Sequence, residues 1–185
     1  MNYTKQFISI ILILVTQTAF GQDSVSFPVK LDTEGFQEVI AKVDNIYISG
    51  QPTAEAFAKL KSDGVTTVVN LRTEREMSNR DNVPFDEKAL LDSLGMNYVH
   101  IPLGGADNPY SNEALIKFAD AVDNAEGKVL LHCIIAWRAS HMWAAYLIQY
   151  KGFSPDKAIE HARGINFGQL PVEGLLGKKL KVDFE

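Results

Sequence analysis

The sequence predicts an α/β fold in which helices flank a mostly parallel central sheet of four to five strands. Short runs of β-branched and apolar residues alternate along the chain with longer stretches of helical periodicity. Glycines follow several of the helical stretches, as is typical of helix ends. This alternation is characteristic of a parallel sheet that is covered on both faces.

Four segments have the composition of strands. The candidates are residues 45–49, 65–71, 96–103 and 128–132. Upstream of them, residues 22–44 have no strong period and are expected to form an extended lead-in. The length of 185 residues suits one domain, which we expect over residues 45–185.

The helical segments are recognised by apolar residues at helical spacing and by capping residues at their starts. Thr53 is a candidate N-cap, and Ser154 with Pro155 opens a later helix. The expected helices cover about 53–63, 85–94, 111–124, 139–150 and 154–163, with one further turn near 171–176. The polar stretch 72–84 is expected to be a loop.

Composition excludes several classes of function. With 18 Lys and Arg against 23 Asp and Glu, the net charge is −5, which argues against a nucleic-acid binder. A single cysteine excludes an internal disulfide and any metal site built from several cysteines. The hydrophobic fraction of 46% and the charged fraction of 22% are those of a globular protein.

Residues 1–21 have the pattern of a secretory signal peptide. Lys5 gives a positive start, residues 7–15 form an apolar run, and Ala19 and Gly21 are small residues suited to cleavage. A membrane anchor is the alternative, but a spanning helix needs about 20 apolar residues. We therefore expect a bacterial periplasmic or secreted protein without stable membrane insertion after cleavage.

One segment combines a nucleophile with an anion cradle. Cys133 follows the strand 128–132, and Arg138 stands where the next helix begins. The free amides of a helix N-terminus bind phosphate oxygens and favour the thiolate form of a cysteine. A guanidinium holds two such oxygens at once. This arrangement suits phosphoryl transfer through a cysteinyl-phosphate.

These motifs resemble the cysteine-dependent protein tyrosine phosphatase superfamily, in its dual-specificity branch. The closer likeness is to the bacterial phosphatase-like domain of beta-lactamase-hydrolase-like proteins. It rests on Gly50-Gln-Pro52, residues 64–72, Tyr98 to Pro102, and His132-Cys133 through Arg138, and it spans roughly residues 45–165. The resemblance implies a dual-specificity-phosphatase-like fold, Cys133 as nucleophile and Arg138 as phosphate ligand, with no metal or organic cofactor.

The resemblance also assigns the substrate-binding loop, which departs from the usual pattern. The loop residues are Ile134, Ile135, Ala136, Trp137 and Arg138. Ala136 stands where the family usually has glycine, and at a positive φ an alanine costs roughly 1 kcal/mol. Trp137 either stacks on a substrate ring or packs the loop against the domain.

Three residues have supporting roles by the same resemblance. His132 is expected to bond the loop backbone and hold the geometry of Cys133. Ser140 either supplies the hydroxyl that helps the thiolate to leave, since Ala139 follows the arginine here, or faces the core. Arg72 either orders the rim of the site or is a solvated loop charge.

The general acid of such phosphatases is an aspartate on a loop after an earlier strand. Asp107 is the one carboxylate in residues 104–110 and is the candidate. Its alternative role is to support a turn before Pro109.

The leading hypothesis is an exported phosphatase that hydrolyses phosphomonoesters. Its partner would be a phosphorylated protein, carrying phosphotyrosine or phosphoserine, or a small phosphate ester. Two alternatives remain. One is a rhodanese-like sulfurtransferase with a persulfide on Cys133. The other is a pseudophosphatase that binds an anion or a protein partner without turnover.

Overall fold

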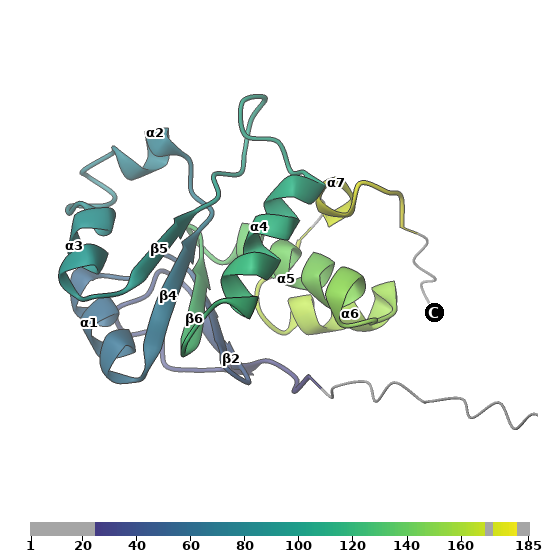
Figure 1. Ribbon diagram of the computed structural model, residues 1–185, viewed down its shortest axis with the longest axis horizontal. Helices are drawn as coiled ribbons and strands as arrows, with labels where there is room; N and C mark the ends of the chain where they lie inside the picture. The colour runs from purple at the N-terminus through teal and green to yellow at the C-terminus, as the bar shows by residue number, and fades with distance from the viewer. Residues whose placement is uncertain (1–24, 169–171, 181–185) are drawn as a thin grey trace, which may run out of the picture.

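The computed structural model describes residues 25–168 and 172–180, and its centre is a mixed, mostly parallel sheet (Figure 1). The strands are β1 (Val29–Lys30), β2 (Ile40–Val43), β3 (Ile46–Ser49), β4 (Val65–Asn70), β5 (Asn97–His100) and β6 (Lys128–His132). Their order is β1-β2-β3-β6-β4-β5. Strands β3, β6, β4 and β5 pair in parallel, and β1 and β2 are antiparallel additions at one edge. The predicted α/β class is confirmed.

The described sheet has six strands, which corrects the expected four to five. The additional strands, β1 and β2, lie within residues 22–44, where only an extended lead-in was expected. A tight turn at Asp44, which has a φ of 48°, joins β2 to β3. The four residues of β2, Ile-Ala-Lys-Val, show no alternation of apolar and polar side chains, so sequence periodicity missed this strand.

Helices cover both faces of the sheet. They are α1 (Ala54–Ser62), α2 (Glu74–Met77), α3 (Glu87–Ser93), α4 (Asn112–Asp123), α5 (Trp137–Tyr150), α6 (Pro155–Arg163) and α7 (Val172–Leu176). Helices α1 and α3 bury their apolar residues on one face, and α4 to α7 pack on the other (Figure 1). None of the described helices is long and apolar enough to cross a membrane.

Helix boundaries differ from the expectation at two places that matter for the site. Helix α5 begins at Trp137, two residues earlier than expected, so Arg138 lies in its first turn. The stretch 72–84, expected to be a loop, contains the single turn α2. The hydroxyl of Thr73 and the carboxylate of Glu76 form a capping box that stabilises this short helix.

The alternation of side chains along β6 sets the two sides of the site. Leu131 and Cys133 face the core beneath α4 to α7, whereas Leu130 packs on the α1 and α3 side. The ring of His132 is also on that second side, with its centroid 5.9 Å from that of Phe57. Because β6 lies at the centre of the sheet, its carboxyl end is flanked by the ends of β3 and β4.

Candidate active site

The loop between β6 and α5 begins with a buried thiol. Cys133 is 1% exposed and its backbone N–H donates to the carbonyl oxygen of Ser49 (3.3 Å). Ala136 has a φ of 62° and a ψ of 6°, so it adopts the left-handed conformation that glycine favours. Residue 136, where the family usually has glycine, therefore does have a positive φ. Ala136 is the N-cap of α5 and has no side-chain hydrogen bond to offer, so the first amides of the helix are uncapped.

Two neighbours fix the loop through its carbonyl groups. The backbone N–H of Gln51 donates to the oxygen of Ile134 (2.7 Å). The side-chain amide of Asn166 donates to the oxygen of Ile135 (2.6 Å). The C=O and N–H of a peptide group point in opposite directions. The backbone N–H groups of Ile135 and Ala136, which follow these carbonyls, therefore point away from Gln51 and Asn166, respectively. Sequence patterns predicted neither contact.

Arg138 is buried and held by three segments. Its Nη1 donates to the carbonyl oxygens of Leu71 (3.1 Å) and Leu103 (2.8 Å), just beyond the ends of β4 and β5. The carboxylate of Glu76 accepts two further bonds, from Nη1 (2.9 Å) and Nη2 (2.7 Å). This bidentate pair fixes the plane of the guanidinium. Sequence reasoning missed Glu76 because it lies in the stretch expected to be a loop.

The charges of Arg138 and Glu76 shift each other's pKa. Burial acts to lower the pKa of Arg138, but the hydrogen bonds to Glu76 and the charge of that carboxylate act against burial, and the pKa is raised. For Glu76, burial raises the pKa, but the bonds from Arg138 and from the backbone of Thr73 outweigh burial and lower it to about 2. Both groups are therefore ionised at neutral pH.

Arg72 is 2% exposed, so it is not a solvated loop charge. Its Nη1 donates to the side-chain oxygen of Gln51 (2.7 Å). Burial lowers the pKa of Arg72, and the charges of Glu76 and Cys133 are among those that oppose this change. The guanidinium groups of Arg138 and Arg72 thus both lie within electrostatic range of Cys133. Arg72 is the one that is bonded to Gln51.

His132 contacts a carboxylate instead of the loop backbone that we expected. Its Nε2 lies 3.1 Å from Oε1 of Glu87, and both side chains are almost fully buried. Glu87 also accepts hydrogen bonds from the amides of Gln51 (2.7 Å) and Asn70 (2.8 Å). Burial raises the pKa of Glu87, but His132 and these donors outweigh burial and hold it below its ordinary value.

Sequence reasoning also missed Glu87, although a signal was present. Glu87 lies four residues before Leu91 on the same face of α3, so a carboxylate occupies the apolar stripe of a helix. A charge at such a position needs buried partners. The sequence shows that a partner is needed but not that it is His132, 45 residues further along the chain.

A cavity of about 300 Å³ opens beside Arg138. It is bounded by α2 with its cap, by residues of the 103–110 segment, and by the start of α5. Trp137 lines it and also packs edge to face on His141, with ring centroids 4.8 Å apart. A Cβ added to Gly168 would meet the indole nitrogen at 2.7 Å, so the ring lies close against this glycine. Trp137 therefore packs the loop against residues 166–168 and also forms a wall of the cavity.

The remaining predicted site residues lie as follows. Asp107 is exposed and does not line this cavity, whereas Gly104, Gly105 and Tyr110 of the same loop do. Its role as general acid stays a prediction. The hydroxyl of Ser140 is within hydrogen-bond distance of the carbonyl oxygens of Trp137 (2.8 Å) and Asn166 (3.0 Å), in the buried seam behind the loop.

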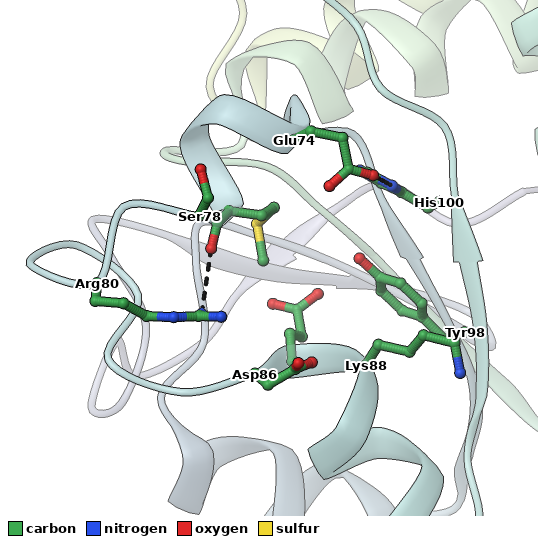
Figure 2. Close-up of a pocket in the computed structure, with 9 residues that line it drawn as sticks. Glu74, Ser78, Arg80, Asp86, Lys88, Tyr98 and His100 are labelled. Atoms are coloured by element: carbon green, nitrogen blue, oxygen red, sulfur yellow. Dashed lines mark hydrogen bonds and ion pairs between the residues drawn. The ribbon is translucent and has the colours of Figure 1, made fainter.

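A second pocket, of about 490 Å³, lies on the other side of the sheet (Figure 2). Glu87 and Tyr98 line it, and Glu74 pairs with His100 at its rim (3.1 Å). The guanidinium of Arg80 is bonded to the carbonyl oxygens of Met77, Val83 and Phe85. Among the described residues, no group of three or more His, Cys, Asp or Glu side chains is placed to hold a metal ion.

A thiol at the end of a central parallel strand, followed by a tight loop and a buried arginine in the first turn of a helix, is typical of the cysteine-dependent phosphatase superfamily. The model of one family within it, described as a DSP-PTPase phosphatase fused to NAD⁺ kinase, matches residues 27–174. The chain therefore belongs to this dual-specificity-type phosphatase family.

Individual relatives agree with this assignment. A beta-lactamase hydrolase-like protein of Xylella fastidiosa is 30% identical over 129 residues, which are 68% of this chain and 29% of that protein. The chain thus spans less than a third of the length of this relative. A putative phosphatase of the DUF442 group from Shewanella putrefaciens is 30% identical, with a TM-score of 0.59 over 78% of this chain and 91% of that one. TpbA of P. aeruginosa shares the fold at 21% identity and a TM-score of 0.57, over 76% of this chain and 81% of that one.

Proposed function

We propose that this chain hydrolyses phosphomonoesters through a covalent cysteinyl-phosphate on Cys133. The observation that carries the proposal is the convergence of Cys133 and Arg138 at the opening of α5. The thiol is one residue past β6, and the guanidinium is fixed by the ends of two neighbouring strands and by Glu76. Family membership supports the same reaction class.

The proposed reaction has two steps. The thiolate of Cys133 attacks the phosphorus atom, the S–P bond forms, and the bond from phosphorus to the ester oxygen breaks. The leaving oxygen takes a proton, for which Asp107 is the candidate donor. Water then attacks the cysteinyl-phosphate and gives a proton to the carboxylate that the first step left behind, while the S–P bond breaks to give inorganic phosphate and the free thiolate. Arg138 and the uncapped amides of α5 stabilise the charge on the phosphoryl oxygens in both steps.

Two kinds of phosphomonoester are the first to test. TpbA has been crystallised with phosphotyrosine and PTPMT1 with the phosphoinositide PI(5)P, and both share the fold of this chain. Trp137 forms a wall of the cavity beside Arg138, which favours a substrate with a flat ring next to its phosphate. We therefore propose phosphotyrosine peptides ahead of phosphoserine peptides.

The test is turnover of p-nitrophenyl phosphate and of a phosphotyrosine peptide by residues 22–185 under reducing conditions. Cys133→Ser is the matched variant, because it removes the thiol and leaves the arginine and the loop amides in place. We expect turnover by the parent chain, none by the variant, and binding of inorganic phosphate by both. Equal turnover by the two chains would refute the cysteinyl-phosphate.

The same experiment separates the alternatives. Phosphate binding without turnover by either chain would identify an anion-binding protein that lacks the chemistry. Sulfur transfer from thiosulfate, with a persulfide on Cys133 in the mass spectrum, would identify a sulfurtransferase. The left-handed conformation of Ala136 favours the phosphatase, because the loop keeps the shape that the glycine of the family would give it.

We further propose that the protein is exported to the periplasm or beyond. The proposal rests on the sequence pattern of residues 1–21, which lie outside the described residues. Expression of the full chain in a bacterium, followed by fractionation and N-terminal mass analysis, tests it. A mature chain that begins at Gln22 supports the proposal, and an uncleaved cytoplasmic chain contradicts it.

A further inference from the structure

Tyr110 stands at the mouth of the proposed site, and no role has been assigned to it. It lies at the end of the loop that follows β5 and lines the cavity together with Trp137 and Arg138. Its ring is partly buried against the core formed with α4 to α7. Charges on Arg138, Cys133 and Glu76 all act on its hydroxyl, so the phenol lies within range of both the nucleophile and the phosphate ligand.

The backbone of Tyr110 is held in place by α7. A Cβ added to Gly174 would meet the carbonyl oxygen of Tyr110 at 2.8 Å and its Cβ at 3.0 Å. Such a close approach requires glycine at that position. Nearby, the side-chain amide of Asn112 donates to the carbonyl oxygen of Leu175 (3.3 Å), which ties the start of α4 to α7 (Figure 1). Tyr110 is thus carried at the edge of the cavity by a fixed segment of chain.

The protonation state of Tyr110 fits a hydrogen-bond donor. Burial raises its pKa above the ordinary value of a tyrosine, and the nearby charge of Arg138 opposes this only in part. The hydroxyl therefore keeps its proton at neutral and moderately alkaline pH. Glu76, the closest carboxylate to Arg138 in the cavity, already accepts two bonds from that arginine.

We propose that the Tyr110 hydroxyl is an additional ligand of the phosphoryl group, donating a hydrogen bond to a non-bridging oxygen while Arg138 holds the others. The proton stays on the tyrosine throughout, so Tyr110 is a binding group and not the acid that protonates the leaving oxygen. The expected effect of Tyr110 on turnover rests on the proposed function. The expected effect of Tyr110 on anion binding does not depend on that function.

Tyr110→Phe removes the hydroxyl and keeps the ring, so the packing against the core is preserved. A hydrogen bond to a charged group corresponds to roughly a 10- to 100-fold effect. We expect a loss of this size in the affinity for inorganic phosphate, measured by calorimetry. We expect a similar loss in kcat/KM for p-nitrophenyl phosphate, with the shape of the pH profile unchanged. Tyr146→Phe is the matched control, because Tyr146 is a buried tyrosine on α5 that does not line this cavity.

Each outcome decides the matter. Phosphate affinity within twofold of the parent chain would overturn the proposal and leave Tyr110 as a wall of the cavity. Loss of the alkaline limb of the pH profile would also overturn it, because Tyr110 would then be the proton donor. If the parent chain binds phosphate without turnover, the proposed function fails, and a weakened affinity in Tyr110→Phe still supports the inference.

Discussion

Replacing Glu87 by glutamine tests whether the buried carboxylate holds the ends of three strands together. The carboxylate accepts from Gln51, Asn70 and His132, which follow or end β3, β4 and β6. A glutamine has one oxygen, so at least one of these donors loses its acceptor. Gln51 cannot compensate by rotating its amide, because its own oxygen accepts from Arg72 (2.7 Å). The change therefore disrupts a chain of bonds that extends to Arg72.

The magnitude follows from these contacts. An unpaired buried donor costs about 1–3 kcal/mol, and the remaining bonds weaken because their acceptor loses its charge. The lower cost of burying a neutral amide offsets part of this sum. We expect Glu87→Gln to lower the free energy of unfolding by about 2–4 kcal/mol at pH 7. For a domain of this size the melting temperature should fall by roughly 5–15 °C.

Urea unfolding at pH 7 and at pH 3 is the assay. The folded-state pKa of Glu87 is depressed, so its contribution is complete above the unfolded value of about 4.5 and is lost as the pH falls from there through the lower folded-state pKa. The difference between parent and variant should therefore shrink at pH 3. Glu74→Gln is the control, because Glu74 is 85% exposed and its removal should cost less than about 0.5 kcal/mol. A loss below 1 kcal/mol for Glu87→Gln, or one that persists at pH 3, would refute this reasoning.

Three further predictions concern the loop and its neighbours. Asp107→Asn should lower kcat for p-nitrophenyl phosphate by about 10²- to 10⁴-fold and remove the alkaline limb of the pH–rate profile; an unchanged profile would assign the proton to another group. Glu76→Gln should cost about 1–2 kcal/mol at pH 7, since its side chain is 21% exposed and solvent weakens its pair with Arg138. Because the pKa of Glu76 is lowered to about 2, urea unfolding should show this difference vanish as the pH falls from about 4.5 towards 2; a constant difference would contradict the ion pair. Ala136→Gly should change the free energy of unfolding by less than about 1 kcal/mol, because relief of the positive φ is offset by a lost buried methyl group and by unfolded-state entropy; a larger change in urea midpoint would mean that the loop moves.

The parts of the fold that sequence patterns predicted are those with local signals. The strands β4 and β6 are runs of apolar or β-branched residues, and the predicted caps Thr53 and Ser154 both accept a backbone hydrogen bond. The short strand β2 shows no alternation of apolar and polar side chains, and the single turn α2 carries too few residues for a period to emerge. Their stability comes from pairing with β3 and from a capping box, respectively.

The candidate site divides in the same way. Cys133 and Arg138 were found because the chemistry lies within six residues of sequence. Glu76 and Glu87 were not found, because each acts on a partner that is 62 or 45 residues away along the chain. Only the fold brings a carboxylate of α2 to the arginine of α5, and a carboxylate of α3 to the histidine that precedes the thiol. A charge pair between two separate elements has no fixed residue spacing, so no sequence motif marks it.

The strained alanine illustrates how such distant contacts maintain a local shape. Ala136 is buried and adopts a left-handed conformation that costs an L-residue roughly 1 kcal/mol. The carbonyl groups on either side of Ile135 are bonded to Gln51 and Asn166, from opposite ends of the domain sequence. Rotating residue 136 to a negative φ would break at least one of these bonds, at about 0.5–1.5 kcal/mol, and would move the start of α5 with its buried arginine. The two hydrogen bonds and the anchored start of α5 together hold residue 136 at a positive φ despite this strain.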